Sequence, residues 1–272
     1  MKLYPFLIAV VLLSSCVDKK DEQADAATGN TTVIPAPVNL NYSIVKIYPH
    51  DTSSFTQGLI WHNNTLYEGT GLNGQSRLMK VDLASGKHKQ KIELAKEYFG
   101  EGITILNDKI YQLTYQEHKV FVYELASFKK IKEFEWNMEG WGLTHNGKQL
   151  IVSTGSSNIY FVNPETFAIE RTLGVFDNNG YLDSINELEF INGSIYANVY
   201  LRDLIVKINP ETGVVEGRID LTDILHKTNQ SFDENIYMSN GYVLNGIAYN
   251  PATNSFYITG KKWPALYEIK LN

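Results

Sequence analysis

The stretch FGEGIT at residues 99–104 places one carboxylate, Glu101, between two glycines in a sequence that otherwise reads as buried β-strand. Glutamate is rarely buried without a partner, so this position needs a chemical explanation. Glycines on both sides indicate a crowded inner strand with no room for larger flanking side chains. Burial raises the pKa of a carboxyl group towards neutrality. Glu101 is therefore predicted to accept and return protons as a general acid and base.

Four other segments carry polar or polar-tipped side chains at positions equivalent to Glu101. The aligned residues are Gln57, Trp141, Glu187 and Asn245. A structural repeat would be expected to repeat its residue, whereas different polar groups that converge on one channel mouth are typical of a binding pocket. The alternative is a narrow, water-filled channel that tolerates any polar residue.

A second set of aligned positions adds aromatic side chains and a cation to the same face. At the end of the second strand of each segment stand Gly71, Tyr115, Gly155, Tyr200 and Lys261. Aromatic walls would exclude water and hold a small organic group. The alternative for each tyrosine is ordinary core packing.

These positions align because one pattern occurs five times after residue 42. Each repeat reads as a strand, a turn rich in Asn, Gly or Asp, a second strand, a connection and a third strand, and the first four continue into a fourth strand. Repeats of about 40–45 residues suit propeller blades. The last repeat lacks its fourth strand, and YSIVKIYPH at 42–50 supplies it.

The sequence therefore predicts an all-β fold, a five-bladed β-propeller with four strands per blade, spanning residues 42–272. Strand 42–50 is expected to pair with the last blade and close the ring, which would leave no free sheet edge between the chain ends. The interval 226–243 is expected to form a loop over one face, and TDILHKT before it to make one helical turn. A β-sandwich is the alternative, but it does not explain the repeat.

Composition excludes some classes of partner. The chain has 272 residues, of which 43% are hydrophobic and 20% charged, and its formal net charge is −6. Binding to nucleic acid needs a basic footprint, and no segment gathers Lys and Arg. We therefore expect no nucleic-acid partner, and we expect a monomer because a closed ring offers no edge strand.

The N-terminus carries an export signal. Residues 1–16 combine a lysine, a short apolar run and the sequence LSSC, which resembles the bacterial lipoprotein box and ends at Cys16. We expect Cys16 to be lipidated, residues 17–41 to be a flexible linker, and the protein to be exported and anchored to a bacterial cell membrane on its periplasmic or surface face. The alternative for Cys16 is an incidental thiol in an uncleaved anchor.

Motifs along every repeat resemble one known family. FTQGL, YEGTG, FGEGIT, EGWGLTH, NELE, LNGIAYN and the TGK–WP–LYEI segment are similar to the plant-type glutaminyl cyclases, also called glutamine cyclotransferases. The resemblance covers residues 42–272. It implies a five-bladed propeller that converts an N-terminal glutaminyl residue of a peptide or protein to pyroglutamate and releases ammonia, without a required cofactor.

The resemblance also implies roles for individual residues. Glu101 would transfer protons, Gln57 and Asn186 would hold the carboxamide, and Lys261 would balance charge or orient the peptide. The expected aromatic cage is Phe55, Tyr115, Trp141 and Tyr200. Family members usually have tryptophan where this chain has Tyr115 and Tyr200, so we expect the reaction to survive and the substrate preference to shift.

Two other functions stay open at this point. Alternation along a strand sends Glu187 and Glu189 to one side, which leaves open a structural Ca²⁺ or a Ca²⁺-dependent, lactonase-like hydrolase that also uses Asn245. A non-catalytic propeller that binds peptides or sugars is the other alternative. No catalytic metal site is expected, because the six histidines have no ligand spacing.

Overall fold

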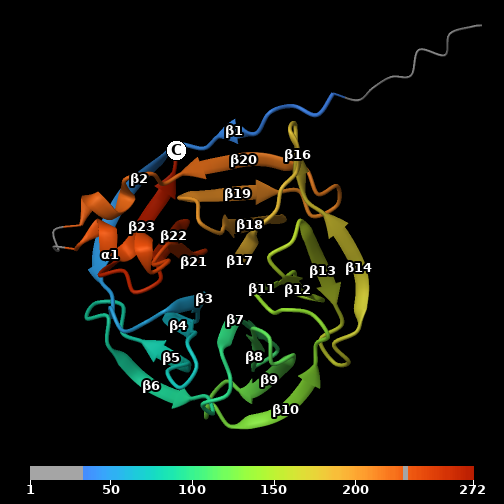
Figure 1. The fold of residues 1–272 in the computed structure, drawn as a ribbon, viewed down its shortest axis with the longest axis vertical. Coiled ribbons are helices and arrows are strands. Elements are labelled where there is room, and N and C mark those ends of the chain that lie inside the picture. The colour runs from blue at the N-terminus through green and yellow to red at the C-terminus, as the bar shows by residue number, and fades with distance from the viewer. Residues whose placement is uncertain (1–32, 229–231) are drawn as a thin grey trace, which may run out of the picture. The chain divides into compact units, whose positions relative to one another are not determined.

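The computed structural model describes residues 33–228 and 232–272, and its compact unit extends from Ile34 to Asn272. Five sheets surround a central axis, and each contains four antiparallel strands that form one blade (Figure 1). The predicted five-bladed propeller is confirmed.

Each blade runs outward from an inner strand beside the axis, and the bounds of the strands are as follows. The first blade contains β3 (Thr56–His62), β4 (Thr65–Thr70), β5 (Arg77–Val81) and β6 (His88–Glu93). The second contains β7 (Gly100–Leu106), β8 (Lys109–Thr114), β9 (Lys119–Glu124) and β10 (Lys130–Glu135). The third contains β11 (Leu143–His145), β12 (Leu150–Ser153), β13 (Asn158–Val162) and β14 (Ile169–Gly174). The fourth contains β17 (Ile185–Ile191), β18 (Ser194–Val199), β19 (Leu204–Ile208) and β20 (Val215–Asp220).

The fifth blade combines strands from both parts of the chain. It contains β21 (Leu244–Asn250), β22 (Ser255–Gly260), β23 (Ala265–Leu271) and, as its outer strand, β2 (Tyr42–Pro49). β2 pairs antiparallel with β23, from Tyr42 opposite Leu271 to Pro49 opposite Ala265. The predicted closure of the ring by the N-terminal strand is confirmed.

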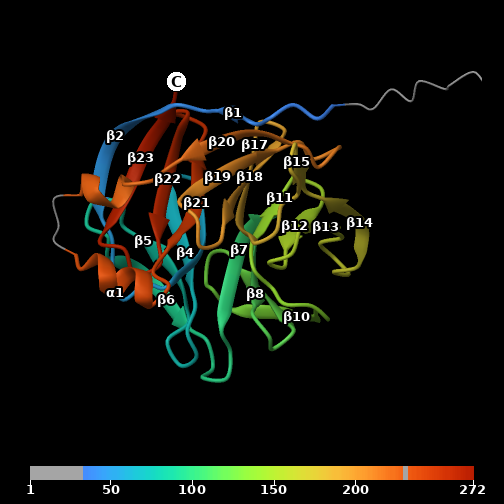
Figure 2. The ribbon, with the colours of Figure 1, turned by 45° about the horizontal axis from the view of Figure 1, so that its top comes forward.

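A short strand upstream of β2 changes the predicted limit of the linker. β1 (Val38–Asn39) pairs in parallel with β20, and the Leu40 amide donates to the Arg218 carbonyl at 2.8 Å. Figures 1 and 2 both show this segment along the outer edge of the fourth blade. The folded chain thus begins before residue 42, because the outer strand β20 offers unpaired backbone groups to which β1 can bind. Residues 17–32 of the expected linker, like Cys16, lie outside the described residues.

The turns predicted between inner and second strands have the backbone that tight hairpins require. Residues Asn63 and Asn64 have φ of 47° and 58°, and Asn107 and Asp108 have 52° and 56°. Two successive residues with positive φ form the type I′ turn, whose twist matches that of paired strands and which favours Asn, Asp and Gly.

Hydrophobic residues fill the spaces between neighbouring blades. Five core clusters are present among the described residues, and each joins two adjacent blades; Ile205 of the fourth blade and Ile258 of the fifth, for example, share one cluster. The inner strand β7 is buried along its whole length, whereas the outer strand β10 is mostly exposed. The core therefore holds each inner strand in a fixed position around the axis.

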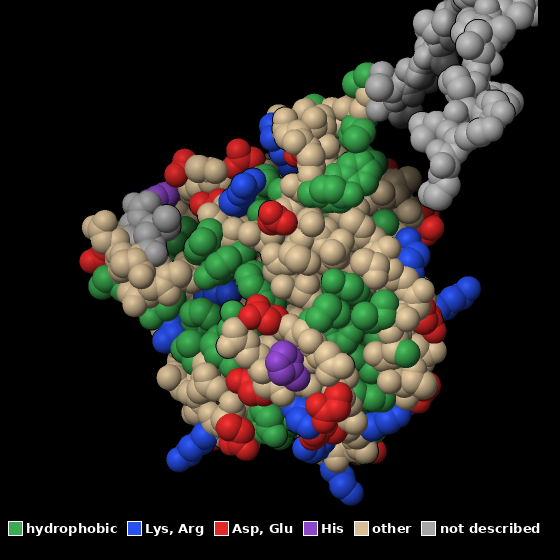
Figure 3. Space-filling view, turned by 45° about the vertical axis from the view of Figure 1, so that its right-hand side comes forward, with side chains coloured by type: hydrophobic (Ala, Val, Ile, Leu, Met, Phe, Trp, Pro, Cys, Tyr) green, Lys and Arg blue, Asp and Glu red, His purple; other side chains and the backbone are tan. Residues whose placement is uncertain are grey.

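The connection between the fourth and fifth blades contains two short helices. The 3₁₀ helix η1 (Ile224–Lys227) confirms the turn expected in TDILHKT, and α1 (Glu234–Ser239) lies in the interval predicted as a loop. Two minor strands, β15 (Phe176–Asp177) and β16 (Gly180–Tyr181), form a hairpin before the fourth blade. Within the described part of the chain, no helix has the length and apolar character needed to cross a membrane. On the face seen in Figure 3, acidic and basic side chains are intermixed.

Candidate active site

The first residues of the inner strands converge at one end of the ring. A register shift of the β-bulge kind occurs near the start of four inner strands: at Thr56/Gly58, Gly100/Ile103, Ile185/Leu188 and Leu244/Ile247. A bulge bends the strand and redirects a side chain. Each bulge contains a polar side chain of interest, and the bulge determines the direction in which that side chain points. The four residues are Gln57, Glu101, Asn186 and Asn245.

A cavity of about 270 Å³ lies among these strand ends. Its lining contains every residue predicted for the substrate site and one more, Phe99. The lining residues are Phe55, Gln57, Phe99, Glu101, Tyr115, Trp141, Asn186, Tyr200 and Lys261. The four polar side chains are buried, whereas the five aromatic side chains are half-buried. The cavity therefore has polar groups in its interior and an aromatic rim.

The aromatic rim is continuous from blade to blade. Ring centroids are 6.1 Å apart for Phe55 and Phe99, 5.8 Å for Phe99 and Tyr115, 6.4 Å for Tyr115 and Trp141, and 5.4 Å for Trp141 and Tyr200. The Lys261 Nζ completes the circuit, 4.9 Å from the Phe55 centroid and 5.0 Å from the Tyr200 centroid. Three of these ring pairs are edge-on and the Phe99–Tyr115 pair is tilted, and together with the cation–π contacts they stabilise the walls of the cavity.

Two glycines of the second aligned set make room for this rim. A Cβ atom on Gly71 would lie 2.2 Å from the Phe99 ring, and one on Gly155 would lie 2.6 Å from the Trp141 indole. Neither glycine belongs to the lining of the cavity, and each lies against an aromatic side chain that does. The Trp141 indole is also held by a hydrogen bond from its Nε1 to the Glu139 carboxylate at 3.1 Å.

Glu101 is 4% exposed, and its two oxygen atoms differ. Oε1 accepts a hydrogen bond from the Gln57 Nε2 at 2.9 Å, whereas Oε2 is buried with no partner among the described residues. Close packing explains the flanking glycines, since a Cβ on Gly102 would lie 2.6 Å from the Trp141 carbonyl oxygen. Burial raises the pKa of Glu101 well above its usual range, Lys261 opposes this rise, and Glu117 and Glu139 add to it. The predicted direction of the shift is confirmed.

Lys261 is the cation that faces Glu101 in this cavity. Its side chain is buried, and burial lowers its pKa to about 8, with Glu101 opposing the decrease. Each group therefore stabilises the charged form of the other in surroundings that disfavour both charges. The pair can exist with both groups charged or both neutral, and this allows protons to be redistributed near neutral pH.

Gln57 lines the cavity, and both ends of its side-chain amide also have protein partners. Its amide donates to Glu101, and its Oε1 accepts from the Asn245 Nδ2 at 3.2 Å. The same Nδ2 donates to the Thr56 carbonyl at 2.9 Å. Asn245 thus lies behind Gln57, and the two amides orient Glu101. Asn186 does line the cavity, and its Oδ1 is buried with no partner among the described residues.

Glu187 and Glu189 do not lie in the cavity. The Glu187 oxygens accept the backbone amides of Leu59 at 3.2 Å and Ile247 at 2.9 Å, and Glu189 accepts from the Tyr249 amide at 3.3 Å. These bonds hold the two carboxylates to the backbone of the first and fifth blades, and a structural Ca²⁺ beside them stays a prediction. Among residues 33–228 and 232–272, no group of three or more His, Cys, Asp or Glu side chains could hold a metal ion.

Phe99 is the lining residue that the sequence analysis missed. It lies two positions before Glu101, as Phe55 lies two positions before Gln57. An alignment of the repeats that also includes the connections before the inner strands would therefore identify Phe99 as a lining residue.

Comparisons with known proteins identify the family and agree with the fold. Residues 8–271 match the family model described as "Glutamine cyclotransferase". A protein of Arabidopsis thaliana named glutaminyl-peptide cyclotransferase is 39% identical over 230 residues, which are 84% of this chain and 70% of that protein. The crystal structure of Myxococcus xanthus glutaminyl cyclase superposes with a TM-score of 0.78 at 33% identity, over 87% of this chain and 98% of that chain.

Proposed function

Because the chain belongs to the glutamine cyclotransferase family, we propose that its cavity converts the N-terminal glutaminyl residue of a peptide or protein to pyroglutamate. The α-amine attacks the Cδ of its own side-chain carboxamide, the new C–N bond closes a five-membered ring, and the bond to the amide nitrogen breaks to release ammonia. Ring closure within one residue needs no second reactant, so proximity is largely supplied by the substrate. The protein has to orient the chain and move protons.

We assign proton transfer to Glu101. The α-amine must enter as a neutral nucleophile, and it loses one proton as its bond to carbon forms. The Glu101 carboxylate accepts that proton and then returns it to the departing nitrogen, which leaves as ammonia. A raised pKa favours such two-way transfer, because the carboxylate is then a stronger base towards the amine than an exposed glutamate would be.

Lys261 and Asn186 are assigned to the carboxamide. As the amine attacks, negative charge develops on the carboxamide oxygen, and a buried ammonium group stabilises that charge far better than water would. Lys261 keeps its proton below its pKa of about 8. The proposed role of Asn186 is to accept a hydrogen bond from the substrate, and it is supported by the buried Oδ1, which has no partner among the described residues.

The observation that carries this assignment is the unpaired Oε2 of Glu101. A buried carboxylate oxygen without a partner is costly, and native structures rarely retain one without a functional reason. Here the neighbouring oxygen is held by Gln57, and the free oxygen belongs to a side chain that lines the cavity. The geometry therefore keeps one acid oriented and one of its oxygens available to substrate.

Ammonia release tests the proposal directly. The full chain is incubated with a peptide that begins with glutamine, and both ammonia and the pyroglutamyl peptide are measured. We expect turnover by the unmodified chain, with or without EDTA, and none above background for Glu101→Gln. The matched control is Glu97→Gln, which removes an exposed carboxylate from the connection before β7, outside the cavity lining. No ammonia from the unmodified chain would overturn the proposal, and loss of activity with EDTA would favour a metal-dependent enzyme.

We also propose that the protein is exported and lipid-anchored at Cys16. The support is the LSSC sequence after a short apolar run, and all these residues lie outside the described part of the chain. In a bacterial host, labelled fatty acid should be incorporated into the unmodified chain and not into Cys16→Ala. Equal labelling of the two would contradict the anchor.

A monomer is proposed on the basis of the closed ring, which pairs the strands of both chain ends within one blade. Light scattering coupled to gel filtration should give the mass of one chain for residues 34–272, the compact unit. A dimer mass would refute this proposal.

A further inference from the structure

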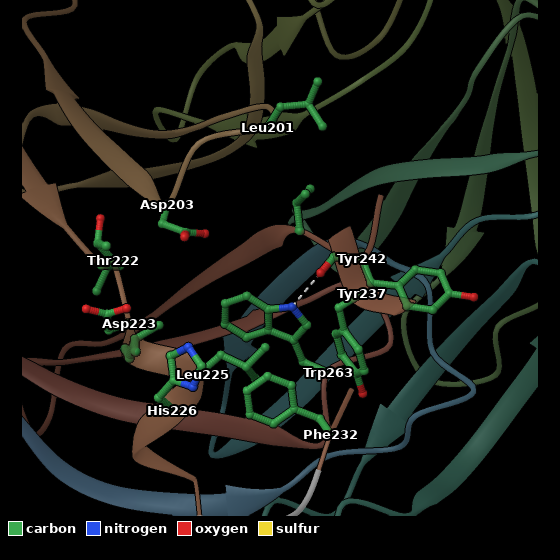
Figure 4. A pocket seen from close by; sticks show the side chains of 13 residues that line it. Leu201, Asp203, Thr222, Asp223, Leu225, His226, Phe232, Tyr237, Tyr242 and Trp263 are labelled. Carbon is green, nitrogen blue, oxygen red and sulfur yellow. Dashed lines mark hydrogen bonds between the residues drawn. The ribbon is translucent and has the colours of Figure 1, made fainter. Parts of the chain in front are cut away.

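A second cavity, of about 200 Å³, lies between the fourth and fifth blades (Figure 4). Its lining comes from three connections: the one between β18 and β19, the one between β20 and β21, and the one between β22 and β23. In each blade the second strand ends, and the inner strand begins, at the end of the ring that contains the active cavity. The two cavities therefore lie on one face of the propeller.

The connection that builds this cavity is long. Residues 221–243 join β20 to the inner strand β21, whereas residues 94–99 and 136–142 make the equivalent links after the first and second blades. The extra length carries η1 and α1, and it contributes Leu225, Phe232 and Tyr237 to the lining. Additional chain at this one place forms a wall that those shorter connections do not provide.

A thin wall separates the two cavities. Leu201 of the second cavity directly follows Tyr200 of the active cavity. The Lys261 backbone amide donates to the Val243 carbonyl at 2.9 Å, and the Tyr242 ring packs edge-on against Phe55 at 6.3 Å. Consecutive Cα atoms of a peptide are about 3.8 Å apart, so a substrate residue that follows one bound in the active cavity is within reach of this wall.

The second cavity has an aromatic side and an acidic side. Figure 4 shows Trp263, Phe232 and Tyr237 facing a group that contains Asp203, Thr222 and Asp223. The Trp263 indole is fixed by a hydrogen bond from its Nε1 to the Tyr242 carbonyl at 2.8 Å. One side can therefore contact an apolar chain while the other contacts a polar group.

The charge of this lining is negative. It contains two carboxylates and His226, and neither Lys nor Arg is part of it; Lys262 lies outside, with its Nζ 5.4 Å from the Tyr242 ring. Burial, and then repulsion by Asp220 and Asp223, raise the pKa of Asp203. A cation placed here would relieve that repulsion, so the cavity is complementary to a long side chain with a positive end.

We propose that this cavity binds the side chain of the second residue of the peptide substrate and favours Arg or Lys there. The inference rests on the proposed cyclisation of an N-terminal glutamine. The methylene groups of the side chain lie against Phe232 and Leu225, and its charged group lies beside Asp203 and Asp223. When the second residue occupies this subsite, the peptide passes over the wall formed by Tyr200 and Lys261. The rest of the peptide then lies outside the active cavity, in which the carboxamide reacts.

The test compares kcat/KM for peptides that differ in the second residue alone: Gln-Gly, Gln-Leu, Gln-Glu and Gln-Arg at the N-terminus. An exposed or half-buried ion pair contributes up to about 1 kcal/mol, which corresponds to about fivefold. We expect Gln-Arg to exceed Gln-Leu by about that factor, Gln-Glu to be slowest, and the advantage of arginine to shrink as salt is added.

Variants then locate the effect. Asp203→Asn should remove most of the arginine advantage, about threefold to fivefold, and leave Gln-Gly within about twofold. The matched control is Asp183→Asn. It removes one exposed carboxylate from the connection between the third and fourth blades, and Asp183 lines neither cavity. Phe232→Ala should reduce Gln-Leu and Gln-Arg alike relative to Gln-Gly.

Each outcome separates this inference from the proposed function. Turnover of Gln-Gly with equal rates for all four peptides would overturn the subsite and leave the cyclase intact. Equal effects of Asp183→Asn and Asp203→Asn would also overturn it, because the preference would then come from general charge. Failure to convert any of the peptides, Gln-Gly included, would instead remove the proposed function itself.

Discussion

Glu101 and Glu187 lie within equivalent bulges at the start of the inner strands of two blades, yet their surroundings give them different tasks. Both are almost fully buried, and burial raises the pKa of both well above the usual range. Both Glu187 oxygens accept backbone amides from the first and fifth blades, whereas one Glu101 oxygen accepts from Gln57 and the other has no partner among the described residues. Glu187 therefore joins blades, and Glu101 is left available to a ligand.

The comparison shows that a raised pKa does not by itself identify a catalytic acid. Both carboxylates are buried by the packing of neighbouring blades, and burial alone shifts the titration of each. What distinguishes Glu101 is an unpaired oxygen on a side chain that lines a cavity, beside a cation that can take part in charge balance. Partners, and not burial, separate structural from functional carboxylates here.

Exchange of each carboxylate for an amide should separate these roles, and the largest effect is expected for Glu101→Gln. Loss of a general acid and base costs about 10²–10⁴-fold in rate, so kcat should fall by at least that factor. The free energy of unfolding, from urea titration at pH 7, should be unchanged or higher, because a neutral amide avoids the cost of a buried charge. A variant that stays active would show that another group moves the proton.

Glu187→Gln should have the opposite signature. The amide nitrogen cannot accept a hydrogen bond, so one backbone N–H of Leu59 or Ile247 loses its partner, and an unsatisfied buried group costs about 1–3 kcal/mol. Urea titration should show this loss, while kcat per folded molecule stays within about twofold of the unmodified chain. Loss of activity with unchanged stability would contradict the structural role of Glu187.

Lys261→Met tests the comparison through the pH dependence of kcat/KM. Lys261 lowers the pKa of Glu101, so its removal should raise that pKa further and move the acidic limb of kcat/KM to higher pH. The basic limb, expected near the Lys261 pKa of about 8, should disappear. Lys262→Met, at the next position of the same connection, should leave both limbs in place. An unshifted acidic limb would show that the two groups do not interact.

The pH dependence of stability should report Glu187 and Glu189. Burial raises the pKa of Glu189 from 4.5 to about 8, and that of Glu187 also rises. From about pH 4.5 upwards the unfolded chain has released protons that the folded protein still holds, so the free energy of unfolding should fall as pH rises towards 8. The slope should be shallower for Glu187→Gln. Stability that increases across this range would contradict the shifts.

Phe99→Ala should give the smallest of these effects. Each edge-on aromatic contact contributes about 0.5–1.5 kcal/mol, so removal of a ring from the rim should raise KM by about threefold to tenfold, with a smaller change in kcat. Phe99→Tyr, which keeps the ring, should restore most of the loss. A decrease in kcat as large as that of Glu101→Gln would place Phe99 in the chemistry itself.

The fold could be predicted from the sequence because its signals are local and repeated. Turn residues with positive φ, such as Asn63 and Asn107, mark each hairpin, and the missing outer strand of the last repeat points to β2. β1 could not be predicted in this way. It is two residues long and pairs through backbone groups of β20, so its side chains carry no pattern.

The sequence predicts most of the residues that line the candidate site, but it predicts less well in which direction each side chain points. Alignment placed Glu187 at the channel, but equivalent bulges follow Gly100 and Ile185, so Asn186 is the structural equivalent of Glu101 and lines the cavity instead. Simple alternation cannot resolve neighbours within a bulge. The orienting role of Gln57 and Asn245 likewise depends on contacts between the first and fifth blades, which a single sequence does not reveal.

The pairing of β2 with β23 also has a consequence for biosynthesis. Ser43 and Asn272, whose side chains hydrogen-bond at the end of this pairing, are 229 positions apart. During translation β2 therefore remains unpaired with β23 until almost the whole chain has been made. Long-range pairing of this kind is slow. A nascent chain that stops before β23 would display two open sheet edges, which makes it a substrate for chaperones or proteases.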